Sequence, residues 1–223
     1  MYSFLYNNKQ IRFENIEGDL ISLNWKKGTF YEIKLLEKIK NLNIEGIYVD
    51  IGAHHGNHSI FFDTFCNSTK VISIEGNPFN FNFLKKNIEL NECSLTLLHN
   101  IIITDKENEI QYMKYNLGNT GSSRIIEKED TNKEKDVISN NTITLDKLLE
   151  NEGKISLMKF DIENYEYKAL LGAEKIISKY HPIIIIELHN DNTYYQEIIN
   201  FLKKYNYKTD GINYAHSPTF IYQ

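Results

Sequence analysis

The chain has 223 residues, 41% of them hydrophobic, which is enough to build the core of one α/β domain. Its formal net charge is −5 and its basic residues are not gathered in one block, so we expect no nucleic-acid partner. The two cysteines, Cys66 and Cys93, lack the paired spacing of a disulfide framework or a cysteine-rich zinc site. The start of the chain lacks a signal-peptide pattern, and the longest apolar run, 183–186, is far too short to cross a membrane. We therefore expect a cytoplasmic protein without membrane insertion.

The N-terminal region is predicted to contain two short strands, at 11–13 and 19–23, with a turn at 17–18 between them. Helical spacing of apolar residues then predicts a helix over 30–42. We expect residues 1–45 to pack on the core and residues 46–223 to form a single globular unit.

From residue 46 onward, buried strands alternate with helices, a rhythm typical of a doubly wound parallel sheet. The charged and polar stretch 127–141 is predicted to be a surface excursion, because strands resume directly after it. The predicted strands are 47–51, 71–75, 95–98 (an extension to 103 is left open), 155–160, 182–187 and the tail segments 207–209 and 219–222; the predicted helices pass through 61–65, begin at Pro78 and at 144, and cover 167–180 and 194–205.

A cofactor signature lies at the end of the first of these strands. Asp50 is followed by Gly52 and Gly56, so a strand-to-helix turn carries glycines where a ligand could approach the backbone closely. Glu75 ends the next strand, about 20 residues beyond the glycine turn. A carboxylate at that point can accept hydrogen bonds from both ribose hydroxyls of a bound nucleoside.

The charge of this turn predicts which nucleoside it binds. A dinucleotide site has the pattern G-x-G-x-x-G against a pyrophosphate, whereas this turn reads D-x-G-x-x-x-G. Asp50 would repel a pyrophosphate but not the sulfonium and ammonium groups of S-adenosylmethionine (SAM), so we predict SAM as the cofactor. The predicted cofactor-binding residues are Asp50, Gly52, Ala53, His54, Gly56, Asn57, Glu75, Gly76, Asn77, Asn100, Ile101 and Asp161.

An ordered set of segments resembles the FkbM family of SAM-dependent methyltransferases. These segments are VDIGAHHGNHS at 49–59, VISIEGNPFNFNFLKKNIELN at 71–91, TLDKLL at 144–149, MKFDIENYEYKALLGAEKII at 158–177 and PIIIIELHN at 182–190. Their order and spacing follow the family over 48–190. Three positions depart from the family pattern: His54 stands in place of Asn, Gly76 in place of Pro, and Asn164 in place of Gly.

The resemblance implies an α/β, Rossmann-like class I methyltransferase fold. Its mostly parallel, seven-stranded sheet would have helices on both faces and a last strand antiparallel to the others. The resemblance also implies O-methylation of a sugar or another small-molecule hydroxyl, as in the biosynthesis of glycans.

Acidic residues at two strand ends are the candidate catalytic groups. Methyl transfer from a sulfonium needs an aligned acceptor oxygen and a group that removes its proton. Asp161 ends one parallel strand, Glu163 follows it, and Glu187 ends the neighbouring strand, with His189 just beyond. We predict that they form one acidic mouth with Asp161 as base or orienting group. They could instead hold a metal, and Asp161 and Glu163 could simply cap the next helix.

Several other residues leave more than one interpretation open. Lys159 could pair with one of the carboxylates, and Arg124 could bind an anionic acceptor. A zinc site of His54, His55 and His58 is disfavoured because the cofactor must already fit at that turn. Trp25 and Tyr31 could cover the cofactor or belong to the core.

Three alternative functions compete with the methyltransferase. An NAD-dependent sugar-modifying enzyme would share the fold but lacks its glycine pattern here, and a non-catalytic SAM-binding subunit would keep the cofactor site alone. A nucleic-acid methyltransferase would be expected to show an Asn/Asp-Pro-Pro-aromatic motif, which this sequence lacks.

Overall fold

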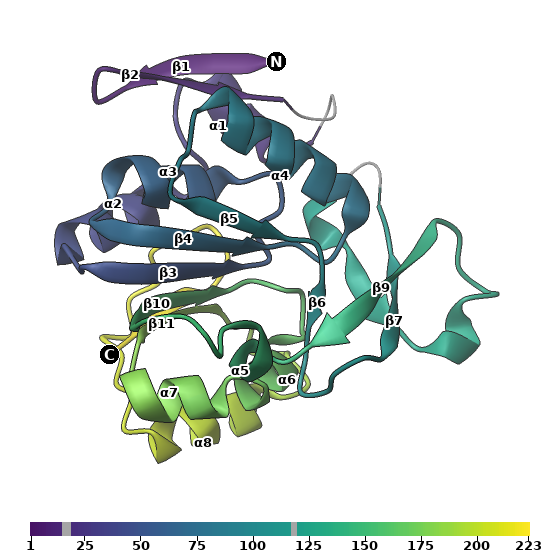
Figure 1. Ribbon diagram of the computed structural model, residues 1–223. Helices are drawn as coiled ribbons and strands as arrows, with labels where there is room; N and C mark the ends of the chain where they lie inside the picture. Colours follow the sequence, from purple (N-terminus) through teal and green to yellow (C-terminus); the bar gives the residue numbers. More distant parts are fainter. Residues whose placement is uncertain (15–18, 117–119) are drawn as a thin grey trace.

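The computed structural model describes residues 1–14, 19–116 and 120–223 (Figure 1). Among them, six strands form the main sheet, in the order β12-β11-β10-β3-β4-β5, rather than the seven that we expected. All neighbours are parallel except β11 and β12, so the antiparallel last strand is confirmed. The strands are β3 (Gly46–Ile51), β4 (Ser68–Ile74), β5 (Thr96–His99), β10 (Ile155–Phe160), β11 (Ile183–Glu187) and β12 (Thr219–Tyr222).

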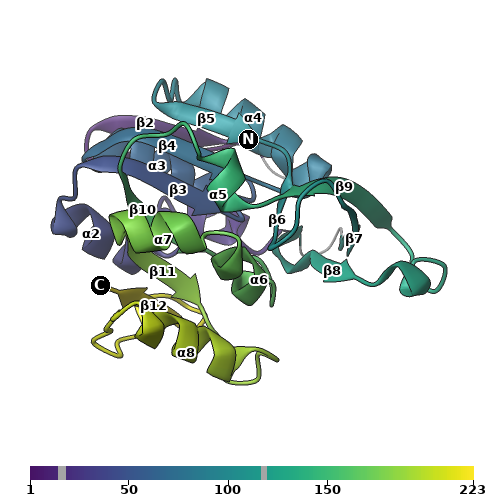
Figure 2. The ribbon, with the colours of Figure 1, turned by 60° about the horizontal axis from the view of Figure 1, so that its bottom comes forward.

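Helices cover both faces of this sheet (Figures 1 and 2). The central strands β3 and β10 are buried along almost their whole length, as expected for apolar runs between two helical layers. Each face therefore has its own hydrophobic cluster. One face is covered by α1 (Ser22–Lys26), α2 (Ile33–Leu42), α3 (Asn57–Phe65) and α4 (Pro78–Leu90), the other by α5 (Leu145–Leu148), α6 (Glu166–Leu171), α7 (Glu174–Tyr180) and α8 (Tyr195–Lys204).

The N-terminal region differs from its prediction. A hairpin of β1 (Tyr2–Tyr6) and β2 (Lys9–Phe13) precedes α1, and the strand expected at 19–23 is wrong. Ser22 and Trp25 are buried one helical turn apart, and Trp25 stacks on Phe13 with ring centroids 4.0 Å apart. Packing of this aromatic pair favours a helix over the strand that the alternation of apolar residues predicted. The turn expected at 17–18 lies outside the described residues.

A second, four-stranded sheet projects beside the main one, in the order β6-β9-β7-β8 (Figure 1). The chain leaves the main sheet after β5, because residues 102 and 103 pair with β9 instead of extending that strand. The polar stretch 127–141 contains a short 3₁₀ turn and most of β9, so part of it is regular structure. The strands are β6 (Ile102–Ile103), β7 (Ile110–Lys114), β8 (Arg124–Ile126) and β9 (Val137–Ile143).

The helix predicted over 167–180 is two helices, α6 and α7, interrupted at Gly172. A Cβ atom at Gly172 would lie 2.2 Å from the backbone oxygen of Thr104, so a larger residue does not fit at this contact. The strand predicted at 207–209 is wrong, because only Thr209 pairs there, in an isolated bridge with Tyr222. The other predicted strands and helices of the main domain are present, with ends shifted by a few residues. No helix in the described part of the chain is long and apolar enough to cross a bilayer.

Candidate active site

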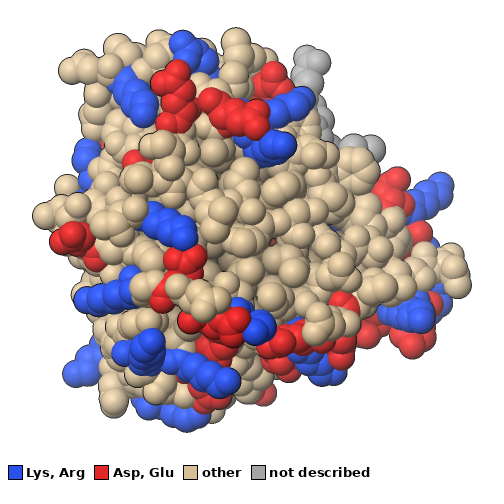
Figure 3. All heavy atoms as spheres, viewed as in Figure 1, with Lys and Arg blue, Asp and Glu red and all other residues tan. Residues whose placement is uncertain are grey.

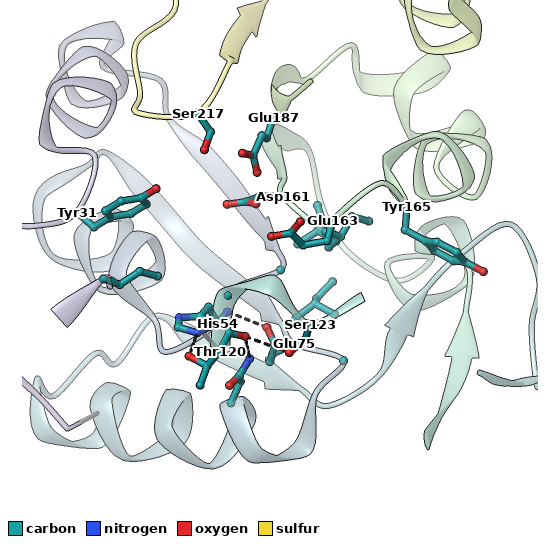
Figure 4. A pocket seen from close by; sticks show the side chains of 18 of the residues that line it. Tyr31, His54, Glu75, Thr120, Ser123, Asp161, Glu163, Tyr165, Glu187 and Ser217 are labelled. Carbon is teal, nitrogen blue, oxygen red and sulfur yellow. Dashed lines mark hydrogen bonds between the residues drawn. The ribbon is translucent and has the colours of Figure 1, made fainter. Parts of the chain in front are cut away.

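A cavity of about 670 Å³ opens at the carboxyl ends of the parallel strands. Gly52 follows β3, Glu75 follows β4, Asp161 follows β10 and Glu187 ends β11, and all four line the cavity. Figure 4 shows the three carboxyl groups among them. Ligands of open α/β sheets bind at this edge, and the volume lies within the usual range of small-molecule sites. Of the predicted site residues, the cavity is lined by Gly52, His54, Glu75, Gly76, Ile101, Asp161, Glu163 and Glu187.

The glycine turn is held in place by contacts with the neighbouring strands of the sheet. Gly52 has a φ of 81°, and its N–H donates to the backbone oxygen of Ile74 over 3.0 Å. A Cβ atom here would lie 1.9 Å from the backbone oxygen of Asp161, so the glycine is needed for packing against the end of β10. His54 also has positive φ, 52°, a conformation that Asn adopts more readily than most residues. The Asn of the family pattern at this position therefore has a backbone explanation.

Glu75 is suited to bind two hydroxyls. It is only 6% exposed, and its two carboxylate oxygens accept the backbone N–H groups of His54 and Asn77, each over 2.8 Å. A carboxylate has about four acceptor positions, so each oxygen can accept one further hydrogen bond from the cavity. Burial raises the pKa of Glu75 to about 7, although the two N–H donors act in the opposite direction.

Asp50 occupies a different place from the predicted one. It is fully buried, accepts the hydroxyl of Ser59 over 2.6 Å, and lies 3.4 Å from the ammonium of Lys159. The parallel register of β3 and β10 puts Asp50 opposite Lys159. Asp50 therefore balances a buried charge and does not face the cavity, which removes the direct repulsion of a pyrophosphate that the sequence suggested.

Asn57, Asn77 and Asn100 hold the walls of the site together. Asn57 accepts the indole N–H of Trp25 and the backbone N–H of Tyr31, both over 3.0 Å. Asn77 caps α4 and donates to Ser123, and Asn100 donates to the backbone oxygen of Glu75. The predicted cofactor residues that do not line the cavity are Asp50, Ala53, Gly56, Asn57, Asn77 and Asn100.

The carboxyl groups of the acidic mouth differ in their protonation. Lys159, 3% exposed, donates to Asp161 over 3.0 Å, which confirms that it pairs with a carboxylate. Burial opposes ionisation of Asp161, but Lys159 and a hydrogen bond with Glu187 outweigh it and hold the pKa of Asp161 below its ordinary value. Burial and the charge of Asp161 raise the pKa of Glu187 to about 9, while Ser217 acts in the opposite direction. At neutral pH, Asp161 is thus ionised and Glu187 carries a proton.

Glu163 is the exposed member of this mouth. Desolvation of its carboxyl group and the neighbouring charge of Asp161 raise the pKa of Glu163 to about 7. Glu163 and Asn164 have φ values of 52° and 70°, so the backbone conformation explains the glycine of the family pattern at 164. The capping alternative is wrong, because the N-cap residue of α6 is Tyr165 and no side chain caps this helix. The nearby carboxylate that accepts a backbone N–H, that of Ile162, belongs to Glu166.

Four parts of the chain contribute residues that the sequence did not indicate. The strands of the second sheet bring apolar residues to the part of the cavity beside Gly76, and α1, the loop before α2 and the tail line the rest. Their positions depend on long-range packing, so local pattern gives no signal for them. These lining residues include Leu20, Asn24, Lys27, Glu32, Ile102, Met113, Thr120, Ser123, Ile125, His216 and Ser217.

The aromatic, basic and histidine side chains that the sequence left open have different surroundings. Tyr31 lines the cavity, whereas Trp25 belongs to the core. Arg124 is 62% exposed, lies 3.8 Å from Glu134 and does not line the cavity. His189 is exposed and pairs with Glu187. His58 pairs with Glu32 over 3.1 Å, away from the partner of His54, Thr120.

The fold and this site define the class of protein. Solved structures with the same arrangement of sheet and helices include a proposed methyltransferase from Streptococcus mutans in complex with SAH, with a TM-score of 0.50, 10% identity and coverage of 86% of this chain and 95% of that one. A precorrin 8w decarboxylase from Methanobacterium thermoautotrophicum has a TM-score of 0.50 and 12% identity, covering 87% and 90%. Both share the fold of this chain.

The sequence itself shows the family to which the chain belongs. The Methyltransferase FkbM domain matches residues 50–209, and the chain belongs to this family. It is also similar to the Methyltransferase FkbM structure from Methylobacillus flagellatus KT, with a TM-score of 0.56 and 19% identity over 78% of this chain. The match covers only 42% of that longer protein. A comparison with curated proteins gave no match.

Proposed function

We propose that the protein is a SAM-dependent methyltransferase that methylates a hydroxyl of an uncharged small molecule or sugar. The observation that carries the proposal is Glu75, which lines the cavity beside the Gly52 turn with hydrogen-bonding capacity to spare on both oxygens. Two adjacent ribose hydroxyls fit this arrangement. The apolar side chains of Ile102, Met113 and Ile125 line the same cavity and suit the flat face of an adenine.

When SAM is bound, its sulfonium supplies the electrophilic methyl group, and the protein's part is alignment and proton removal. Glu163 accepts the proton of the acceptor hydroxyl, because its pKa lies close to neutral pH. Asp161, held ionised by Lys159, orients the hydroxyl by accepting a hydrogen bond. Glu187 remains protonated and fixes the position of Asp161.

The charges of the cavity argue for an uncharged acceptor. A phosphate or carboxylate on the acceptor would be desolvated beside several acidic groups. On the face shown in Figure 3, basic and acidic side chains are interspersed, which does not favour a polyanion either. The described lining has one lysine, Lys27, against the carboxyl groups of Glu32, Glu75, Asp161, Glu163 and Glu187.

Binding and turnover test the proposal in two stages. Calorimetry should show SAM and SAH binding, with NADH and ATP far weaker, and Glu75→Ala should weaken SAH binding by about 10–150-fold, the equivalent of roughly 1.5–3 kcal/mol. Equal thermal stabilisation by NADH and SAH would favour the NAD-dependent alternative. A screen of sugars and other hydroxyl compounds, with SAH release as readout, should then identify the acceptor. SAH binding without any turnover would favour a non-catalytic subunit.

A further inference from the structure

A second polar cluster lies beside the cavity, between the N-terminal region and the glycine turn. It consists of Asp19, His54 and His55, whose potential ligand atoms all lie within 4.8 Å of one another. The Oδ2 atom of Asp19 is 4.0 Å from Nε2 of His54 and 3.8 Å from Nδ1 of His55. Asp19 and His55 are at most 1% exposed. Within the described residues, this is the group of histidine and acidic side chains that comes close enough to hold a metal; the acidic mouth does not.

The tautomer of His55 can be deduced from its neighbour Asn80. The amide nitrogen of Asn80 donates to the backbone oxygen of Thr120 over 3.2 Å, which fixes the other end of the amide as an acceptor. That oxygen, Oδ1, lies 3.2 Å from Nε2 of His55. Nε2 therefore carries the proton and donates it to Asn80. The other ring nitrogen, Nδ1, is left with a free lone pair and no proton.

This lone pair has no hydrogen-bond partner. Nδ1 of His55 is completely buried, and it points toward Oδ2 of Asp19, a second atom that carries a lone pair. Two acceptors 3.8 Å apart in a buried site repel each other, and the desolvated nitrogen is costly without a partner. A cation held by both atoms would turn this repulsion into attraction.

The surroundings match those of a metal ligand. A histidine that binds a metal normally donates its second ring N–H to an oxygen that fixes the ring, as His55 does to Asn80. The hydroxyl of Thr120 lies 2.7 Å from Nε2 of His54 and donates to Oδ2 of Asp19 over 2.9 Å, so it holds these two side chains on one side of the cluster.

We propose that Asp19, His54 and His55 form a binding site for a divalent transition metal, with Zn²⁺ as the best match. Imidazole nitrogens with a carboxylate oxygen are typical zinc ligands at about 2.0–2.2 Å, which places neighbouring ligand atoms about 3.3 Å apart. The two contacts of Asp19, 3.8 and 4.0 Å, therefore shorten by roughly 0.5–0.7 Å on binding. The two histidine nitrogens, which lie within 4.8 Å of each other, also approach, so His54 turns away from Thr120 and from its stacked position on His55 toward the metal. The metal joins the segment before α1 to the glycine turn.

Titration of the protein with metal alone tests this site. After EDTA treatment and dialysis, the full chain is titrated with Zn²⁺ and with Co²⁺, followed by calorimetry and by the visible absorption of bound Co²⁺. We expect one equivalent per chain. Asp19→Asn and His54→Asn should each weaken binding at least tenfold, and His55→Phe should abolish it. His189→Asn, which removes an exposed histidine, is the matched control and should bind as the wild type does.

Circular dichroism of each variant shows whether it is folded. If His55→Phe does not fold, the other two variants still decide the outcome. Asp19→Asn preserves the size of the side chain, and His54→Asn introduces the residue of the family pattern. The proposal is overturned if the wild type binds no stoichiometric metal, or if both of these variants retain its affinity. Because the readout is metal binding, the result does not depend on whether SAM binds or methyl transfer occurs.

Discussion

Glu75, Glu163 and Glu187 occupy similar positions in the sequence, each at or just after the end of a parallel strand, yet their surroundings give them different chemistry. Burial and two N–H donors act on Glu75, whereas burial and the charge of Asp161 act on the other two. The sequence located all three at the binding edge. It could not predict which of them is ionised, because Lys159 and the contact between Asp161 and Glu187 depend on tertiary structure.

The pKa of Glu75 predicts a pH dependence of cofactor binding. Ribose hydroxyls donate to the ionised carboxylate, so a proton on Glu75 competes with the ligand. With a pKa of about 7, SAH affinity should be highest above pH 8 and fall about tenfold by pH 6, measured by calorimetry. The variant Glu75→Gln should bind weakly with no such fall. A wild-type affinity that stays constant from pH 6 to 8 would contradict the role of Glu75.

Substitution of Glu163 tests the proposed base. Glu163→Gln preserves size but cannot take up the acceptor proton, so kcat should fall by about 10²–10⁴-fold while SAH affinity is unchanged. In the wild type, kcat/KM should rise with pH through about 7, and this rise should be absent in the variant. Glu197→Gln, on the exposed side of α8, is the matched control. Near-normal turnover of Glu163→Gln would exclude the role of base.

At the scale of whole elements, the predictions succeeded where pattern and packing agree. The apolar runs of β3, β10 and β11 and the start of α4 at Pro78 were readable from sequence. The second sheet was not, because β6 has two residues and β9 lies in a polar stretch whose pairing with β7 is set by tertiary contacts. As a result, Met113 and Ile125, which line the cavity, were missed.

Asn57 links two such elements and allows a stability test. Its side chain accepts from Trp25 and from the N–H of Tyr31, and it donates to the backbone oxygen of Tyr31, so α3 is tied to the N-terminal region. Asn57→Ala leaves these buried groups unpaired and should lower the free energy of unfolding by about 1–3 kcal/mol or more, measured by urea denaturation. Asn200→Ala, at an exposed position of α8, should change it by less than about 0.5 kcal/mol. Equal midpoints for the two variants would contradict this link.

For the whole molecule, the two hydrophobic clusters stabilise a sheet whose binding edge carries unfavourable charges. Asp50, Lys159, Asp161 and Glu187 meet between these clusters, where partial burial makes each ionisation depend on its neighbours. Prediction from the sequence was therefore strongest for the layered core and weakest for the protonation states at this edge. Global stability should report those states directly through its dependence on pH.

The folded-state pKa of Glu187, about 9, exceeds its ordinary value of 4.5, so the folded state retains a proton that the unfolded chain releases. The stability contributed by Glu187 is therefore complete below about pH 4.5 and is lost progressively as pH rises toward 9. Asp161 titrates in the opposite sense, but its window lies below its ordinary pKa of 3.8 and does not overlap.

Glu187→Gln should remove this dependence, because a neutral amide can still donate to Asp161 but has no proton to lose. In thermal unfolding without ligand, the variant and the wild type should have similar Tm values near pH 5, and the variant should be the more stable one near pH 8. The same comparison for Glu197→Gln, an exposed glutamate on α8, should show no difference that depends on pH. If Glu187→Gln were instead equally destabilised at both pH values, Glu187 would be ionised in the folded protein, and the proton assigned to the pair with Asp161 would be absent.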